Sequence, residues 1–565
     1  MRLVESLSSV WRSAMGRRLV FTVATSVLML SDDLIQKLFN PNNLAQFELS
    51  YVVTIVIINT LLWLTHRWFA LVVTGLFASM QIAQLTHISV TGTPLAPYDI
   101  GKFFEASGEI ALALVYAWQD HVYLFIVWLA SWGAAFYMFA RFSGTVNPRP
   151  SWVPLLLVVL ILGSKPERAT RRDMIAFMPG PTRSSLHNSI NAFSYYFTRM
   201  AGRDQQVLRP DYLPYEVKPR VTGGETPQNI ILLLVDSLRH DRLQVNGYER
   251  ETTPFLAQLD ALGALETRTG LASSVATGSS LPLLLNVVRE PGNVQMINQH
   301  RANLFRNAQQ AGYKTFWLST QESKVLHALG ARYIDVIKTL EDDPLDIKVR
   351  GDNELVTWLE EKEWGEKNFV VILSRSVHSP YEANYAKPDA VEMWSTKAPD
   401  LAFSDRMNNA YDNAILYFDG ILERKITELK QSLPGHSVVV ITADHGQMLG
   451  EQNAWGHNRL QPAVASVPIL MHQWGLAMNS PGLTLPDSDY VSHYELGEWL
   501  LNVMQFELVN PQNVANVHYF QGEDLYRDNL YRRVLEDHRG FTFCDLSQVS
   551  RYNDVSQCQA TLTSE

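Results

Sequence analysis

The sequence predicts an N-terminal transmembrane bundle of about five α-helices, followed by a C-terminal α/β domain with a mainly parallel central sheet. Apolar runs dominate from about Phe21 to Leu162. From about Asn188 onward, short apolar runs that end in polar residues alternate with helical stretches, which is typical of an α/β protein. At 565 residues the chain exceeds what one hydrophobic core usually organises, so at least two domains are expected.

Five apolar segments are candidates to span a membrane. They are Leu19–Ile35, which Asp32 and Asp33 interrupt, Phe47–Thr65, Phe69–Leu85, Val122–Ala140, and the short Trp152–Gly163. With five spans, the arginines that precede the first helix and those between the fourth and fifth fall on one side. The positive-inside rule makes that side cytoplasmic, so the C-terminal domain is expected outside the cytoplasm.

The predicted domain boundaries follow from this change in composition. Residues 1–165 form the transmembrane domain, residues 166–226 a bridging helix or linker rich in Arg and Pro, and residues 227–565 the domain with the sheet. The formal net charge of −10 argues against nucleic acid as a partner, because binding a polyanion needs clustered Lys and Arg.

Three apolar runs after residue 227 predict buried strands, namely Ile230–Val235, Phe369–Leu373 and Val438–Ile441. The run "ASVPILMHQW", residues 465–474, predicts a further strand. Helices are expected between them at Thr253–Leu262, Ala302–Ala311 and Asn408–Leu433. Because the carboxyl ends of parallel strands meet at one edge of a sheet, polar residues that follow these strands are expected to converge there.

The polar residues at these ends are Asp236, His378, Asp444 and His445, with His457 twelve residues beyond His445. Any one of them alone is more often a helix cap or a hydrogen-bonded structural residue. Several of them at one edge of a sheet suit Zn²⁺, or Mn²⁺ if the ligands are rich in oxygen. The chain has no CxxC pair, so a metal would be held by Asp, Glu, His or hydroxyl oxygen.

The stretch "SSVATGSSLP" contains the candidate nucleophiles Thr277, Ser279 and Ser280. Chemistry alone does not choose among these hydroxyls. A metal would activate any of them by lowering the pKa of the alcohol.

The motifs "VDSLRHDRL", "NGYERETTPFL", "TGSSLP", "AGYKTFWLSTQ", "NAYDNAILYFD" and "TADHG" occur in this order. Together they resemble the alkaline-phosphatase/sulfatase superfamily. With the helical N-terminus, the chain resembles the superfamily's membrane branch, the phosphoethanolamine transferases, and is closest to those that modify the lipopolysaccharide core. The C-terminal domain is therefore expected to have a sulfatase/alkaline-phosphatase-like fold.

The resemblance implies roles for particular residues. The metal ligands would be Asp236, Thr277, Asp444 and His445, with Thr277 also the nucleophile. The resemblance assigns His378 and His457 to catalysis and substrate binding, and Lys324 to binding of the donor phosphate. Most of these transferases have Glu where this chain has Asp236, and a formylglycine motif, which sulfatases need, is missing near Thr277.

The implied function is a metal-dependent phosphotransferase of the bacterial inner membrane with its catalytic domain in the periplasm. It would transfer phosphoethanolamine from phosphatidylethanolamine to an envelope glycan or lipopolysaccharide through a phospho-threonine intermediate. The implied cofactor is Zn²⁺, with Mn²⁺ or Mg²⁺ as alternatives. The functional alternatives are a phosphoglycerol transferase that uses phosphatidylglycerol, a sulfatase-like hydrolase, and a catalytically inactive lipid-binding regulator.

The two cysteines, Cys544 and Cys558, are expected to form one disulfide in an oxidising periplasm.

Overall fold

The chain forms two compact units in a computed structural model. The first unit comprises residues 1–204 and 452–455, and the second residues 205–451 and 456–565. This division falls inside the predicted bridge of residues 166–226. The structure describes residues 14–31, 49–91, 95, 97, 99–101, 107–147, 150–171, 177, 185–201, 210–220, 226–321, 326, 328–385, 390–398, 400–476, 483–525 and 529–552.

The first unit is helical, with a helix in each of the five predicted segments. Its longer helices are α2 (Ala14–Met29), α4 (Leu49–Leu64), α5 (Arg67–Thr91), α7 (Ser107–Val146), α8 (Trp152–Arg171) and α10 (Ser185–Tyr195). Two boundaries differ from the prediction, since α7 begins well before Val122 and α8 continues past Gly163. Polar residues such as Gln119 and Lys165 end a hydropathy run but do not end a helix, because both are good helix formers.

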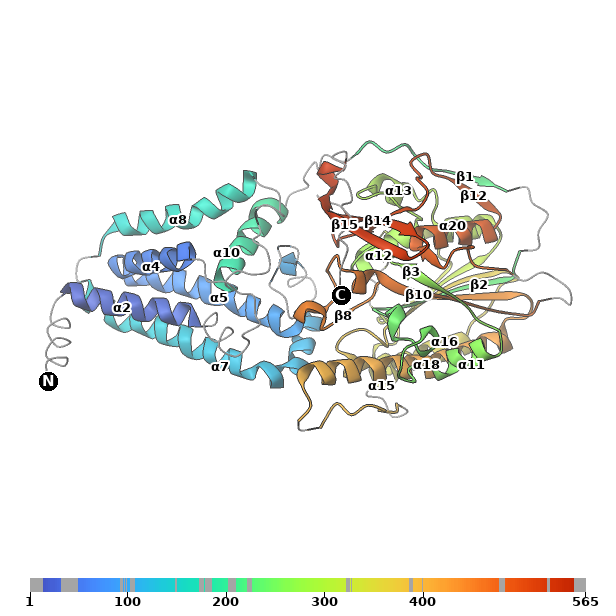
Figure 1. Ribbon diagram of the computed structural model, residues 1–565, viewed down its shortest axis with the longest axis horizontal. Helices are drawn as coiled ribbons and strands as arrows, with labels where there is room; N and C mark the ends of the chain where they lie inside the picture. Colours follow the sequence, from blue (N-terminus) through green and yellow to red (C-terminus); the bar gives the residue numbers. More distant parts are fainter. Residues whose placement is uncertain are drawn as a thin grey trace. The chain divides into compact units, whose positions relative to one another are not determined.

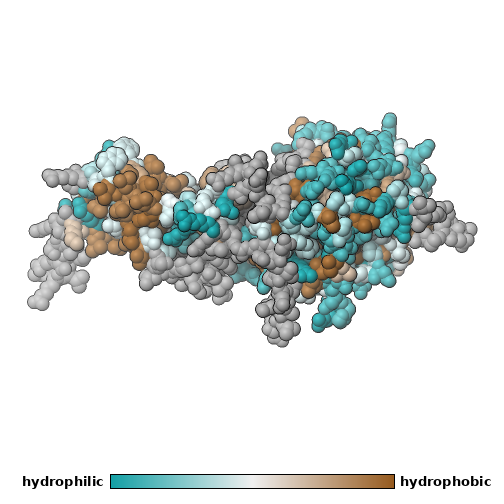
Figure 2. Space-filling view, turned by 90° about the horizontal axis from the view of Figure 1, so that it is seen from above, coloured by the Kyte–Doolittle hydropathy of each residue, from teal (hydrophilic) through white to brown (hydrophobic). Residues whose placement is uncertain are grey.

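Two helical segments among the described residues are long and apolar enough to cross a membrane, Arg67–His87 and Phe125–Val146, and a shorter apolar helix covers Tyr51–Leu64. Figure 2 shows hydrophobic residues gathered over the surface of this unit. The exposed apolar side chains include Leu19, Val23, Val53, Ile57, Val72, Leu76, Ile126, Leu129, Leu156 and Leu160. Such a surface is compatible with a lipid environment.

The second unit is built on an eight-stranded sheet with the order β11-β3-β10-β7-β2-β6-β4-β5. The strands are β2 (Asn229–Val235), β3 (Glu266–Leu271), β4 (Lys314–Ser319), β5 (Val336–Lys338), β6 (Asn368–Ser374), β7 (Ser437–Ala443), β10 (Ser466–Trp474) and β11 (Tyr490–Ser492). Strand β10 is antiparallel to both of its neighbours, β3 and β7, whereas the other pairings of this sheet are parallel. The sheet is therefore mixed, with its central strands parallel.

Helices cover both faces of the sheet (Figure 1). One group comprises α11 (Pro254–Ala261), α15 (Pro344–Arg350), α16 (Asn353–Glu360) and α18 (Phe403–Ser432). The other comprises α12 (Thr277–Leu285), α13 (Val294–Gln299), α14 (Leu304–Gln310) and α20 (His493–Val503). Short helices are α17 (Tyr381–Tyr385) and α19 (Pro462–Ala465).

Alternation along the central strands explains the two helical layers. In β2, Ile230, Leu232 and Leu234 pack in one core with apolar residues of α12, α14 and α20. Every residue of β2, β6 and β7 is buried, which is why these strands are continuous apolar runs in the sequence.

Smaller strands lie outside this eight-stranded sheet. They are β1 (Glu216–Pro219), β8 (Met448–Leu449), β9 (Trp455–Gly456), β12 (Phe506–Val509), β13 (Val517–Gln521), β14 (Leu530–Asp537) and β15 (Gly540–Gln548). Strands β13, β14 and β15 form an antiparallel sheet. Cys544 of β15 is disulfide-bonded, and its predicted partner Cys558 lies outside the described residues.

Candidate active site

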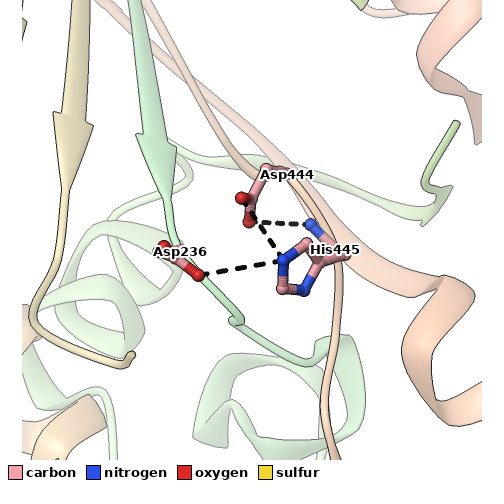
Figure 3. Close-up of side chains that lie close together, drawn as sticks. All are labelled: Asp236, Asp444 and His445. Carbon is pink, nitrogen blue, oxygen red and sulfur yellow. Dashed lines mark hydrogen bonds and ion pairs between the residues drawn. The ribbon is translucent and has the colours of Figure 1, made fainter. Parts of the chain in front are cut away.

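Two acids and an imidazole meet where β2 and β7 end. The strands are parallel and Val235 pairs with Ala443, so the residues that follow them, Asp236 and Asp444, are neighbours. The Nε2 atom of His445 lies 3.9 Å from Oδ1 of Asp236 and 3.5 Å from Oδ2 of Asp444 (Figure 3). All three side chains are buried, and they offer ligand atoms within 4.8 Å of one another.

Ser237 holds both carboxylates of this cluster. Its φ of 67° is a left-handed conformation, which directs its backbone N–H to Oδ1 of Asp444 at 3.1 Å. Its hydroxyl donates to Oδ1 of Asp236 at 2.8 Å. The buried hydroxyl of Tyr411 donates to the Ser237 carbonyl at 2.7 Å and accepts the N–H of Arg239 at 2.9 Å. This clamp maintains a backbone conformation that is uncommon for residues other than glycine.

Close packing around Gly446 leaves no room for a side chain at this position. A Cβ at this position would lie 2.4 Å from the carbonyl oxygen of Ala463 and 3.0 Å from that of Ser466. The N–H of Gly446 donates to the Val464 carbonyl at 2.7 Å. A larger residue would push the backbone that carries His445 away from its neighbours.

Thr277 is the first residue of α12, and its hydroxyl faces the cluster. The Oγ1 atom lies 3.4 Å from Oδ2 of Asp236 and 3.5 Å from Nε2 of His445. These separations are long for hydrogen bonds, and the hydroxyl lies beside two potential ligand atoms.

The two competing hydroxyls point elsewhere. Ser279 is fully buried and interacts with the Ala276 carbonyl at 3.1 Å and with the hydroxyl of Ser274 at 2.6 Å. Ser280 is also fully buried and donates to the backbone carbonyl of Asp444 at 2.5 Å. Their oxygens therefore serve the packing of α12, whereas that of Thr277 is directed at the cluster.

Backbone carbonyls fix the tautomers of two histidines, because a carbonyl can only accept a hydrogen bond. Nδ1 of His445 lies 2.9 Å from the Gly446 carbonyl and donates to it, so that in the neutral ring the lone pair is on Nε2, which faces the acids. Nδ1 of His457 lies 3.1 Å from the Val275 carbonyl and is protonated for the same reason. The ring of His457 stacks on His445 with centroids 4.4 Å apart, and the ring of His378 is 6.4 Å from that of His457.

The acids differ in pKa. Burial raises the pKa of Asp236, but the positive charge available on His378, His445 and His457 outweighs it and holds that pKa well below its usual range. Burial and the nearby charge of Asp236 raise the pKa of Asp444 to about 6. Two carboxylates this close repel each other, so the cluster is an environment that favours a cation.

The residues of the cluster fit a divalent metal. Oδ2 of Asp444 is buried and accepts no hydrogen bond from the described residues, which is costly unless a cation is bound. The Nδ1–H of His445 holds the ring so that Nε2 is directed at the acids, as is usual for a histidine that ligates a metal. Two carboxylates, one imidazole and one hydroxyl form a set of N and O donors that suits Zn²⁺.

Gln321 is a residue of the site that sequence reasoning missed. Its Nε2 donates to Oδ2 of Asp236 at 2.7 Å, on the same oxygen that Thr277 approaches. It follows β4, which pairs with β6 in the sheet, an arrangement that the sequence does not reveal. The predicted donor-phosphate ligand Lys324 lies outside the described residues.

The fold and this cluster define a sulfatase-like domain of the alkaline-phosphatase type. Residues 228–473 match the model of the sulfatase family. The integral membrane lipooligosaccharide phosphoethanolamine transferase A (EptA) from Neisseria meningitidis has the same fold, with a TM-score of 0.54 at 17% identity. The match covers 86% of this chain and 95% of that one, and so includes N-terminal helices.

Curated relatives include two transferases. The putative transferase YhbX from Escherichia coli O157:H7 is 24% identical over 392 residues, which is 66% of this chain and 68% of that protein. The Kdo(2)-lipid A phosphoethanolamine 7''-transferase from Salmonella typhimurium is 25% identical over 354 residues, which is 58% of this chain and 59% of that protein.

Proposed function

We propose that this chain transfers phosphoethanolamine from phosphatidylethanolamine to a cell-envelope glycan or glycolipid, through a covalent intermediate on Thr277. The observation that carries the proposal is the position of the Thr277 hydroxyl, 3.4 Å from Asp236 and 3.5 Å from His445. The transferred group is inferred from the relatives that are named phosphoethanolamine transferases.

Asp236, Asp444, His445 and Thr277 would hold the metal, which we propose is Zn²⁺, with Mn²⁺ or Mg²⁺ as alternatives. When bound, the cation lowers the pKa of a coordinated hydroxyl and offsets charge on the phosphate. The orientation of Nε2 of His445 toward the acids and the buried Oδ2 of Asp444, which accepts no hydrogen bond from the described residues, support this assignment.

The reaction would proceed in two half-reactions. In the first, Oγ1 of Thr277 attacks the lipid phosphorus, a new P–O bond forms, and the P–O bond to diacylglycerol breaks. The hydroxyl proton ends on the diacylglycerol oxygen. In the second, a hydroxyl of the acceptor attacks the same phosphorus and the P–O bond to Thr277 breaks, so that the threonine regains a proton. We assign His378 and His457 to holding the phosphate and moving these protons, and Lys324 to the donor phosphate.

A donor lipid explains why such a domain would be attached to a helical unit with an apolar surface. We propose that residues 1–165 form a multi-pass anchor in the bacterial inner membrane and that residues 227–565 lie in the periplasm. The positive-inside pattern of the arginines supports this orientation.

Lipid specificity tests the proposal. The purified full-length protein is incubated with vesicles that contain headgroup-labelled phosphatidylethanolamine or phosphatidylglycerol, and diacylglycerol release is measured. Release from phosphatidylethanolamine with label retained on protein or glycan supports the proposal. Release from phosphatidylglycerol alone indicates a phosphoglycerol transferase, and free headgroup phosphate as the sole product indicates a hydrolase. Lipid binding without any release indicates an inactive regulator.

A further inference from the structure

Two buried residues of opposite charge, Asp352 and Lys425, are linked through the hydroxyl of Ser374, and the proposed reaction does not use them. Asp352 immediately precedes α16, and Lys425 is in the middle of α18. Both side chains are buried, with Lys425 fully inaccessible. Burying two charges is expensive and is compensated only where hydrogen bonds satisfy them well.

Asp352 accepts hydrogen bonds from the ends of two strands. Its Oδ2 accepts the backbone N–H of Ser376 at 2.8 Å, the hydroxyl of Ser376 at 2.5 Å and the hydroxyl of Ser374. Its Oδ1 accepts the hydroxyl of Thr320, which follows β4. Although Asp352 is at the N-terminus of a helix, its side chain makes no capping bond there, so it serves the strand ends instead.

Lys425 keeps this carboxylate charged. Its ammonium group donates to the hydroxyl of Ser374 at 3.1 Å. Burial raises the pKa of Asp352, but the charge of Lys425 and the three hydroxyls lower it below its ordinary value. Burial lowers the pKa of Lys425 to about 8, which leaves it mostly protonated at neutral pH.

The two strand ends that Asp352 joins carry parts of the site. Thr320 precedes Gln321, whose amide holds Oδ2 of Asp236. The carbonyl of Ser374 accepts the backbone N–H of Asp236 at 3.0 Å. Ser376 is two residues before His378, and the N–H of His378 closes that turn on the Arg375 carbonyl at 2.9 Å.

We infer that Asp352 is a positioning residue that ties together the segments after β4 and β6, and so sets Asp236 and His378 relative to each other. This inference rests on the proposed function. Lys425 supplies the countercharge that allows the carboxylate to be buried. A carboxylate is needed at position 352 because its two oxygens accept four hydrogen bonds. An amide in its place offers only one acceptor oxygen.

Three variants of the full-length protein in detergent test the inference, with wild type alongside. Asp352→Asn removes the charge at nearly the same size. The double variant Asp352→Asn/Lys425→Met removes both charges, which restores electrostatic balance in the core without restoring the hydrogen bonds. Asp419→Asn is the matched control, because Asp419 is also a buried acid but holds the N–H groups of Phe255 and Leu256, far along the chain from the strand ends.

For each protein we measure the Zn²⁺ dissociation constant, the kcat for diacylglycerol release and the melting temperature. We expect the double variant to have a higher melting temperature than Asp352→Asn. Its kcat should remain below that of wild type, and its Zn²⁺ dissociation constant above it, each by about 10- to 100-fold. Asp419→Asn should leave kcat and the Zn²⁺ dissociation constant near their wild-type values. If the double variant recovers wild-type kcat and Zn²⁺ affinity together with its stability, Asp352 is merely structural and the inference is wrong.

The same experiment separates this inference from the proposed function. If wild type releases no diacylglycerol from any lipid, the proposed function fails, and the Zn²⁺ dissociation constants alone then decide the inference. Unchanged Zn²⁺ affinity in the double variant would overturn it in that case, and a weakened affinity would support it.

Discussion

Two clusters in the second unit bring a histidine and two acids together, yet they differ in what their atoms already contact. One is Asp236, Asp444 and His445, and the other is Glu495, His518 and Glu536. Each set offers ligand atoms within 4.8 Å of one another. Proximity alone therefore does not distinguish them.

In the second cluster, the acids already have hydrogen-bond partners. Glu495 accepts the N–H and the hydroxyl of Ser492, both at 2.8 Å, and so completes the capping box of α20. Glu536 accepts the hydroxyl of Ser488 at 2.9 Å and contacts Nε2 of His518 at 2.9 Å. These bonds cap α20 and join β13 and β14 to each other and to the segment before β11.

The first cluster has atoms that are available to bind a metal ion. Asp444 has a buried oxygen that accepts no hydrogen bond from the described residues, Nε2 of His445 is directed at the acids, and the hydroxyl of Thr277 lies beside His445 and Asp236. The difference shows that a site is recognised by unsatisfied donors and acceptors that point at one place, rather than by the residue types alone.

Removing a ligand should produce the largest effect. Asp444→Asn keeps the size but removes charge, and His445→Ala removes the nitrogen ligand. Each should lower bound Zn²⁺ to a small fraction and decrease kcat by roughly a thousandfold or more, since metal activation contributes several kcal/mol. Metal content by elemental analysis and diacylglycerol release are the measurements.

Glu536→Gln in the second cluster is the matched control, expected to retain both metal and activity. If it loses Zn²⁺ while Asp444→Asn keeps it, the assignment of the two clusters is reversed.

An intermediate effect is expected from Ser237. Ser237→Gly favours the left-handed backbone but loses the hydrogen bond to Asp236, and Ser237→Ala loses that bond and strains the backbone. Both should weaken Zn²⁺ binding by about 10-fold or more, as is usual when the partner of a ligand is lost. The glycine variant should melt at a higher temperature than the alanine variant. Calorimetric Zn²⁺ titration and thermal unfolding measure the two effects, and wild-type Zn²⁺ affinity in both variants would contradict the role given to Ser237.

The smallest effect concerns a third buried acid, Asp419, whose oxygens are used by two backbone N–H groups. Burial raises its pKa from 3.8 to about 7. Between these values the folded protein binds a proton that the unfolded chain releases, so this group makes stability decrease as pH rises from about 4 to 7. Asp419→Asn abolishes that slope, and its free energy of unfolding relative to wild type should increase by ~3 kcal/mol from pH 4.5 to pH 8. A difference that is constant with pH would show that Asp419 does not titrate in this range.

The strand-end residues were accessible from the sequence because they follow recognisable apolar runs. The predicted strand Ile230–Val235 lies within β2, and the predicted helix Thr253–Leu262 contains α11. Once the strands are known to be parallel and adjacent, the meeting of Asp236 with Asp444 follows from topology.

Other features had no such signal. Strand β10 is antiparallel, which an apolar run cannot reveal, and β3 has the sequence "ETRTGL", which lacks one. Ser237, Gln321 and Asp352 act through loop conformations and long-range hydrogen bonds. No periodicity encodes such contacts, because they depend on how separate elements pack.

The central claim is that Thr277 carries the transferred group, and peptide mass spectrometry tests it most directly. The full-length protein is incubated with phosphatidylethanolamine in the absence of acceptor, then digested and analysed beside Thr277→Ala and Ser279→Ala variants. We predict a phosphoethanolamine adduct on Thr277 in wild type and in Ser279→Ala, with no adduct in Thr277→Ala. An adduct on Ser279 or Ser280, or diacylglycerol release at the wild-type rate by Thr277→Ala, would contradict the account.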